Sequence, residues 1–331
     1  MTQSPFVVIT SISAPTPAVR AFADRVGDHL IVVGDHKTPP EWSLPPAEYL
    51  GVEAQRQSGM LAPLLPWNHY CRKMLGYLRA IRRGAEIIYD TDDDNAPKAD
   101  WDVPSFEGSW FTTASSPGWV NVYRWFTDAH IWPRGFPLRA ISDPRTIPSS
   151  DHAVRTRARV GVWQALADGD PDVDAVYRLV HGRECHFDAR DPLVLGDGTL
   201  CPFNSQATAF CRDCFPLLYF PASVTSRVTD ILRGLVAQPI LWAAGFRLGF
   251  TSATVVQDRN PHDLLRDFEA EIPLYLHAEV IVDAVVAAVR SGATMGDNLV
   301  SAYEALVRVN VVDAREPSRV EAWLDDLASC G

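Results

Sequence analysis

Two apolar runs near the N-terminus predict buried strands. The first, Phe6–Ile12, reads "FVVITSI", and the second, Leu30–Val33, reads "LIVV". Both are rich in β-branched residues, which favour strands. Residues 16–26 between them predict a short helix. A strand, a helix and a second strand in this order are typical of a parallel sheet, in which ligands bind beyond the carboxyl ends of the strands.

A basic amphipathic helix and a third strand come next. Asn68 is suited to cap the amino end of this helix and Gly84 to end it. Between them, apolar residues recur at helical spacing, at Tyr70, Met74, Leu78 and Ile81. Residues 86–89 then predict a strand, which brings four carboxylates to its carboxyl end: Asp90, Asp92, Asp93 and Asp94.

The pattern changes twice in the rest of the chain. Residues 101–148 are rich in Trp, Pro and Gly and predict a long irregular segment, which in a compact domain is usually functional or mobile. Strand and helix patterns return over 158–180, 201–210 and 224–238. Helices alone are predicted over 262–271, 275–290, 295–309 and 317–328. We therefore expect an α/β domain over 1–274, with a mostly parallel central sheet, and a helical C-terminal extension over 275–331.

Composition narrows the class of protein. The chain has 331 residues, of which 47% are hydrophobic, and this is ample for a large core. The net charge of −11 disfavours general binding to nucleic acid, because phosphate contacts need Lys and Arg. No apolar run approaches the 18 or so residues of a membrane span. The N-terminus lacks the basic segment of a signal peptide, so we expect a cytoplasmic protein.

The six cysteines are too sparse for a disulfide scaffold. Cys211 and Cys214 form a single CxxC motif, which together with Cys201 and His186 could hold zinc. Reduced structural thiols are the interpretation that we favour.

The stretch "DTDDDN" at residues 90–95 allows three interpretations. The first is a solvated acidic loop. The second is a calcium loop, but the glycine and the distal glutamate of that motif are absent. The third is a site for Mg²⁺ or Mn²⁺, which take one or two carboxylates and fill their other positions with substrate oxygens and water. Because the cluster ends a buried strand, we favour a metal that holds a diphosphate.

The preceding helix supplies cations that suit this interpretation. A departing nucleoside diphosphate gains negative charge, which a metal and nearby cations would stabilise. Arg72 and Lys73 lie near the amino end of the helix, itself favourable to anions. Each residue could equally be an ordinary surface cation.

Five ordered blocks within residues 6–270 resemble the STELLO-type glycosyltransferase-like family and, more distantly, the plant reversibly glycosylated polypeptides, which are UDP-arabinopyranose mutases. The blocks are "VVITSISAPT", "VVGDHKTP", "NHYCRKMLGYLRAIRRGAEIIYDTDDDN", "IWPRGFPL" and "VTDILRGLVAQ". The resemblance implies a Rossmann-like GT-A fold, a nucleotide-sugar donor, with a UDP-sugar as the first expectation, and Mn²⁺ or Mg²⁺ at an Asp-x-Asp motif.

The same resemblance implies roles for particular residues. Asp92, Asp93 and Asp94 match the Asp-x-Asp motif, with Asp94 as the metal ligand and Asp92 near the ribose or the metal. The ends of the first two strands would hold the nucleotide, and the residues there are Thr10, Ser11, Asp35 and Lys37. Ordinary turn chemistry is the competing interpretation for these residues.

Three further residues are candidates for the sugar and acceptor side. Arg134 in "PRGFPL" occupies the place of the glycosylated arginine of the mutases, and we expect it near the sugar. Asp230 could act as the general base of an inverting transferase, or form a helix-surface ion pair. His262 could contact the metal or the diphosphate, whereas His277 is expected to be structural.

We therefore expect a metal-dependent glycosyltransferase that transfers from a nucleotide sugar to an acceptor that the sequence does not identify, such as a glycan, a small molecule or a protein. Two alternatives stay open: a nucleotide-sugar mutase, for which Arg134 would be essential, and a non-catalytic scaffold. The helical tail from about 275 has no counterpart in the family pattern that we recognise. It could form a homo-oligomer or cover the acceptor site.

Overall fold

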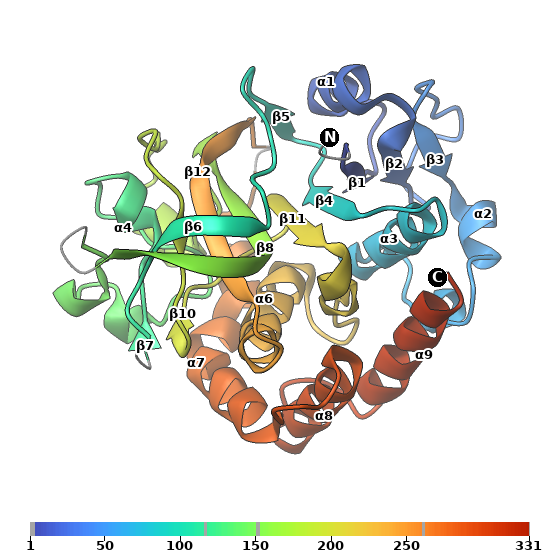
Figure 1. The fold of residues 1–331 in the computed structure, drawn as a ribbon. Helices are drawn as coiled ribbons and strands as arrows, with labels where there is room; N and C mark the ends of the chain where they lie inside the picture. The colour runs from blue at the N-terminus through green and yellow to red at the C-terminus, as the bar shows by residue number, and fades with distance from the viewer. Residues whose placement is uncertain (1–3, 116–117, 150–152, 260–261, 331) are drawn as a thin grey trace.

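The computed structural model describes residues 4–115, 118–149, 153–259 and 262–330. Its centre is a ten-stranded mixed sheet in the order β3-β2-β1-β4-β11-β8-β6-β9-β12-β5, in which β8 also pairs with β12 (Figure 1). The strands are β1 Phe6–Thr10, β2 Leu30–Val33, β3 Glu48–Leu50, β4 Ile87–Thr91, β5 Asn95–Pro97, β6 Glu107–Thr112, β8 Val154–Gly169, β9 Leu193–Val194, β11 Ala207–Cys211 and β12 Arg247–Gln257. A small second sheet pairs β7 Gly118–Trp119 with β10 Thr199–Leu200.

The first four strands are parallel and lie between two helices. Alternate residues of β1 point to opposite faces, so Val7 and Ile9 join the core beneath α1 Pro17–Val26, while Val8 joins the core beneath α3 Lys73–Arg82. Helix α3 lies very close to the sheet at Gly76, where an added Cβ would come within 2.6 Å of the Val8 side chain. Only glycine permits this approach.

The directions of the other strands bring five strand ends together. Strand β11 is antiparallel to both β4 and β8, so β8 runs in the same direction as β4. Strand β12 is parallel to β8 and pairs Gln257 with Gly169 at their ends. The carboxyl ends of β1, β2, β4, β8 and β12 therefore lie at one edge of the sheet, which is where open α/β sheets bind ligands.

Four helices form an arc that returns the chain from α6 to the neighbourhood of α3 (Figure 1). They are α6 Ser226–Ala243, α7 Leu264–Ala288, α8 Met295–Arg308 and α9 Glu316–Ala328; the shorter helices are α2 Val52–Arg56, α4 Tyr123–Phe126 and α5 Ala175–Val180. Both carboxylate oxygens of Asp326 on α9 accept backbone hydrogen bonds, at 2.9 Å, from Met60 and Leu61. The apolar core runs without interruption from the sheet into these helices.

The α/β fold with C-terminal helices is confirmed, and it is the GT-A-like arrangement that the resemblance implied. The boundary expected at 274/275 falls inside α7, because the helices predicted over 262–271 and 275–290 form one helix that contains Pro273. No helix in the described part of the chain is long and apolar enough to cross a membrane.

Two local expectations were wrong, and one strand was missed. Asn68 does not cap α3, since its φ is +55°; the ring of His69 instead accepts a hydrogen bond from the Cys71 amide before a 3₁₀ turn that leads into the helix. The segment 101–148 is not wholly irregular, because it contains β6. Strand β12 lies in a stretch for which the sequence led to no prediction.

Candidate functional site

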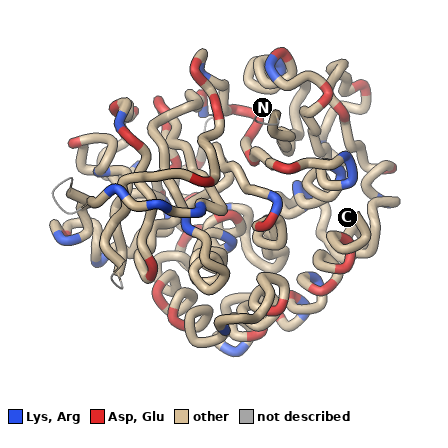
Figure 2. The backbone as a smooth tube through the Cα atoms, viewed as in Figure 1, with Lys and Arg blue, Asp and Glu red and all other residues tan. Residues whose placement is uncertain are grey.

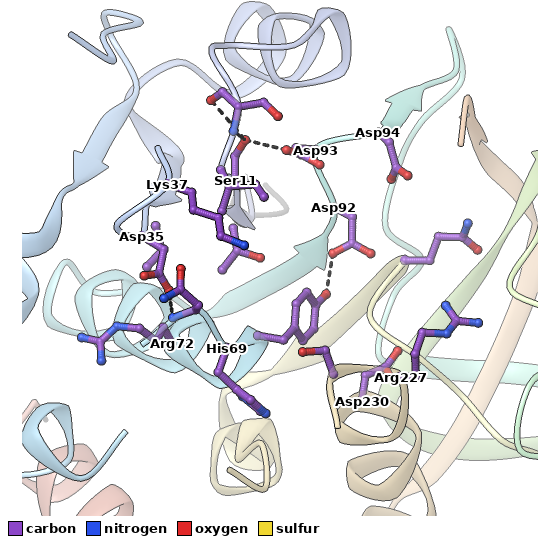
Figure 3. Close-up of a pocket in the computed structure, with 18 of the residues that line it drawn as sticks. Ser11, Asp35, Lys37, His69, Arg72, Asp92, Asp93, Asp94, Arg227 and Asp230 are labelled. Carbon is purple, nitrogen blue, oxygen red and sulfur yellow. Dashed lines mark hydrogen bonds between the residues drawn. The ribbon is translucent and has the colours of Figure 1, made fainter. Parts of the chain in front are cut away.

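A cavity of about 570 Å³ lies at the edge where the strand ends meet (Figure 3). This volume is typical of a small-molecule site. Of the twelve residues predicted from the sequence, all except Lys73 line this cavity; they are Thr10, Ser11, Asp35, Lys37, Arg72, Asp92, Asp93, Asp94, Arg134, Asp230 and His262. Segments far apart in the chain thus meet in one place.

The first carboxylate of the acidic cluster is neutralised from inside the protein. Asp90 is fully buried and lies 2.6 Å from the ammonium of Lys73 and 2.7 Å from the guanidinium of Arg233. Burial lowers the pKa of Lys73, but Asp90 and Asp92 outweigh this effect and raise it. Asp90 is therefore a structural ion-pair partner and not a ligand for a substrate.

Lys73 lies beneath the cavity and not on its wall. Its ammonium donates to the Thr91 carbonyl at 2.5 Å and contacts Asp92 Oδ1 at 3.1 Å. The ammonium also donates to the Tyr70 hydroxyl at 2.9 Å, so hydrogen bonds to Thr91, Asp92 and Tyr70 occupy its three protons, and Asp90 adds an ion-pair contact. The expected direct contact of Lys73 with a diphosphate does not fit this geometry. The positive charge of Lys73 instead stabilises the carboxylates of Asp90 and Asp92 from beneath the cavity.

Asp92 presents a carboxylate to the cavity. Its Oδ1 accepts from Lys73 and from the Tyr70 hydroxyl, and among the described residues Oδ2 has no hydrogen-bond partner. Burial raises the pKa of Asp92 to about 7; Asp94 and Asp90 add to this effect, while Lys73 and Tyr70 oppose it. The side chain is still 31% exposed. Such a half-satisfied carboxylate is suited to bind a cation from the cavity.

The other two aspartates tie neighbouring strands to β4. Asp93 accepts a hydrogen bond from Ser11 at the end of β1, with 2.5 Å between the two oxygens. Asp94 accepts from Gln257 at the end of β12, at 2.9 Å. Burial raises the pKa of both carboxyls, and the hydrogen bonds from Ser11 and Gln257 oppose the rise. The cluster thereby links the two halves of the sheet.

The carboxylates fit a divalent cation only as an open site. Nowhere in the described ranges do three or more His, Cys, Asp or Glu residues lie close enough together to hold a metal ion. Asp92 and Asp94 both line the cavity, which fits an ion that takes one or two protein carboxylates and completes its shell with substrate oxygens and water. His262 also lines the cavity, but its Nδ1 lies 3.2 Å from Asp267 on α7, and burial together with Arg259 lowers its pKa.

The side of the cavity that was expected to hold a nucleotide differs from expectation at Arg72. Its guanidinium points away from the cavity, stacks 3.4 Å from the Trp67 ring centre and donates to Gln55 at 2.6 Å (Figure 3). Lys37, in contrast, is exposed and directs its ammonium into the cavity (Figure 3). Lys37 is thus the predicted cation that a bound anion can reach without rearrangement.

Asp35 shapes the same side of the cavity. Its two oxygens accept backbone hydrogen bonds, both at 2.7 Å, from His36 and from Asn68. The carboxylate therefore holds the end of β2 against the segment that leads into α3, and it contributes to the wall of the cavity.

Arg134 and Asp230 meet in a buried ion cluster that the sequence did not reveal. Arg134 donates to both oxygens of Asp172, at 2.7 and 2.8 Å, and to both oxygens of Asp230, at 3.1 and 2.9 Å. Burial lowers the pKa of Arg134, but the two carboxylates outweigh it and raise that pKa well above its usual value. Arg134 is therefore a permanent cation that orients Asp230 at the cavity.

Two arginines of the cavity wall were missed. Arg227 on α6 donates to Glu271 at 2.9 Å, and Arg259 after β12 donates to Asp267 at 2.9 Å; both acids lie on α7. Burial, together with Arg178 and Arg227, lowers the pKa of Arg259 to about 10. The signal for Arg259 was its place in "QDRNPH", which becomes informative only once β12 is recognised as a strand that ends at this edge.

The alternative zinc site is not formed in the structure. Cys211 pairs with Ile87 at the amino end of β4, so the CxxC motif lies at the opposite edge of the sheet from the cavity. Cys201 is buried in the core, and its amide donates to Gln238.

Comparison with known proteins shows a similarity to one family. Residues 227–331 match the family described as STELLO glycosyltransferases. Two relatives from Arabidopsis thaliana, named "Probable glycosyltransferase STELLO1" and "Probable glycosyltransferase STELLO2", are each 28% identical, over 261 and 263 residues. Each match covers 72% of this chain and 34% of the relative, so the chain spans about a third of the length of these relatives.

The family match corrects one expectation. The helical tail from about 275 was described as having no counterpart in the family, yet α7, α8 and α9 all lie within the matched residues 227–331. The tail is part of the family's pattern. The chain is therefore related to the STELLO glycosyltransferases, as its five ordered sequence blocks indicated.

Proposed function

We propose that this protein is a metal-dependent glycosyltransferase that binds a nucleotide sugar at the carboxyl edge of its sheet, with a UDP-sugar as the donor to test first. The observation that carries the proposal is the position of Asp92 and Asp94 on a cavity that also receives the ammonium of Lys37. Carboxylates and a cation that share one cavity suit a metal-bound diphosphate.

Each side of the cavity has a separate role in this proposal. Asp92 and Asp94 would hold Mn²⁺ or Mg²⁺, which when bound would stabilise the negative charge of the departing diphosphate. Lys37 would contact the diphosphate directly. Thr10, Ser11 and Asp35 would border the nucleoside, since they lie at the ends of β1 and β2.

The acceptor side would be formed by the cluster around Arg134. Asp230 lies in the cavity wall, and two hydrogen bonds from Arg134, one to each carboxylate oxygen, fix its orientation. Carboxylate oxygens have lone pairs beyond those that Arg134 uses, so Asp230 can still accept a proton from an acceptor hydroxyl. In an inverting reaction Asp230 would be the general base.

The mutase alternative is less well supported by the same geometry. A guanidinium can attack a sugar only after it loses a proton, and two buried carboxylates hold Arg134 in its charged form. A scaffold without activity would have no use for a carboxylate, such as that of Asp92, that faces the cavity with one oxygen left to bind a cation.

Isothermal titration of UDP, GDP and UDP-sugars, each with and without Mn²⁺, tests the donor site. We expect UDP to bind only with Mn²⁺, and binding to weaken at least about tenfold in Asp94→Ala. Asp100→Ala is the matched control, because Asp100 is an exposed aspartate six positions later in the chain. Failure of the folded wild type to bind any of these nucleotides would favour the scaffold.

A further inference from the structure

Helix α7 carries apolar side chains on two opposite faces. Its inner face packs into the core through Leu274, Ala278, Ile281 and Val285. Its outer face exposes six large apolar residues: Val286 near the carboxyl end and, before it, a run of five, Leu265, Phe268, Ile272, Leu276 and Val280. Leu265 and Leu276 are the most exposed of these, at 69% and 67%.

These five residues, the α7 stripe, occupy a single face. At about 100° per residue they fall within an arc of roughly 120°. A surface helix normally places charged residues on that side. From the exposed fractions, the stripe presents on the order of 500 Å² of side chain, comparable to the largest patches on monomers, which usually mark an interaction site.

The charges near the stripe disfavour a membrane surface. Acidic positions interrupt α7 along its length (Figure 2). By their helical spacing, Glu269, Glu279 and Asp283 fall within the same arc as the apolar residues. An interfacial helix would instead carry Lys and Arg beside its apolar face, because the lipid surface is anionic. The stripe is therefore suited to a protein surface.

We propose that the α7 stripe is the interface of a homodimer, in which the α7 helices of two copies pack antiparallel about a two-fold axis near Ile272. Leu265 and Phe268 precede Ile272 by seven and four positions, and Leu276 and Val280 follow it by four and eight. This spacing is nearly the same in both directions. An antiparallel copy therefore sets Phe268 against Leu276 and Leu265 against Val280, as a self-complementary two-fold contact requires.

Charge complementarity supports the antiparallel direction. Arg266 lies at the amino end of the stripe, and its pair with Asp263 is exposed and contributes little. Asp283 lies at the carboxyl end together with Glu279, whose own pair with Arg139 is also largely exposed and contributes little. In an antiparallel pair each Arg266 approaches the acidic end of the other copy. The stripe alone supplies more than half of the roughly 800 Å² that a standard interface buries on each partner, and polar neighbours would supply the rest.

The proposed dimer would also act on the cavity. The inner face of α7 carries Asp267 and Glu271, which hold Arg259 and Arg227 in the cavity wall. Packing a second copy onto the outer face would restrict the movement of this helix and so of both arginines. The dimer itself is independent of the proposed transferase activity, because it rests only on the outer face.

Sedimentation velocity over a range of protein concentrations tests the interface. We expect a dimer of the 36.6 kDa chain and, for Leu276→Glu or Phe268→Glu, a dissociation constant at least about tenfold higher. Val154→Glu is the matched control, since Val154 on β8 is 65% exposed and lies away from α7; it should leave the dimer unchanged. Circular dichroism shows that each variant is folded.

A cysteine on the axis gives a second, independent measurement. Ile272→Cys should form a disulfide-linked dimer on mild oxidation, because a residue near a two-fold axis meets its own copy. Val154→Cys and the wild type should stay uncrosslinked. A wild type that stays monomeric at every concentration would overturn the proposal, and it would do so even if the protein bound lipid vesicles. A Leu276→Glu variant that dimerises as tightly as the wild type would also overturn it.

Discussion

The ammonium of Lys73 lies 2.6 Å from the carboxylate of Asp90, and neither side chain is accessible to solvent. Because Asp90 also pairs with Arg233, one buried carboxylate holds helices α3 and α6 against β4. The four carboxylates of "DTDDDN" thus divide into one buried structural partner, Asp90, and three that line the cavity, Asp92, Asp93 and Asp94.

Removing the cation of this pair should destabilise the fold. Lys73→Met leaves Asp90 with Arg233 alone and Asp92 without its cation, and we expect a loss of about 3–5 kcal/mol in the free energy of unfolding. Urea denaturation measures it. Arg79→Met removes a partly exposed pair with Glu48 and should cost less than about 1 kcal/mol. Equal effects of the two substitutions would contradict the structural role of Lys73.

The raised pKa of Asp92 predicts that this carboxyl lowers the stability of the folded protein in a pH-dependent way. The folded protein keeps a proton on this carboxyl up to about pH 7, whereas an unfolded aspartate loses it near its ordinary value, so stability falls as pH rises between these two values. Asp92→Asn should remove this dependence. Because the side chain is partly exposed, we expect the variant to gain about 1–3 kcal/mol over the wild type between pH 4 and pH 8.

Chemical denaturation of both proteins without metal, at several pH values, measures that gain. Asp102 lies on an exposed loop, so Asp102→Asn is the control. The difference in free energy of unfolding between this variant and the wild type should be the same at every pH. A constant difference between Asp92→Asn and the wild type would mean that the carboxyl titrates normally.

Arg134 should not tolerate replacement by lysine. A lysine ammonium cannot donate in parallel to two carboxylates as the guanidinium does to Asp172 and Asp230, so Arg134→Lys should lower the free energy of unfolding by about 2–4 kcal/mol. Arg145→Lys, in an exposed pair with Asp143, is the control and should change little. Thermal unfolding compares them. A fully stable Arg134→Lys protein would weaken the role of Arg134 as the centre of this cluster.

The C-terminal helices should unfold together with the sheet. Asp326→Ala removes two backbone hydrogen bonds to a buried carboxylate and should cost about 2–4 kcal/mol. Since α9 contributes Trp323 to the common core, tryptophan fluorescence and far-ultraviolet circular dichroism should report one transition with the same midpoint. Two separate transitions would instead indicate that the helices form an independent unit.

A site residue could be predicted from the sequence when it follows a strand that the local pattern reveals. Ser11, Asp35 and Asp92 follow short apolar runs, so their position at the sheet edge could be predicted from local pattern. Asp172 and Arg259 follow β8 and β12, whose pairing joins distant segments and leaves no local signal. The burial of Lys73 was also hidden, because its partner Asp90 was counted with the exposed acids.

The contacts of a charged side chain decide its role, and these contacts are non-local. Arg72 and Lys73 are adjacent in the sequence, yet one stacks on Trp67 and the other enters the core beneath Asp92. Sequence spacing placed both beside the cavity, but only the tertiary packing of α3 determines where each cation points.

That packing depends on a position with no side chain. Gly76 sets the height of α3 above β1 and β2, and thereby the depth at which Tyr70 and Lys73 meet Asp92. A methyl group at residue 76 would push the helix outward and raise the base of the cavity without altering any residue that lines it. The space available to a ligand is therefore adjustable from a position that no ligand touches, which offers a route to change what the cavity accepts while its carboxylates stay intact.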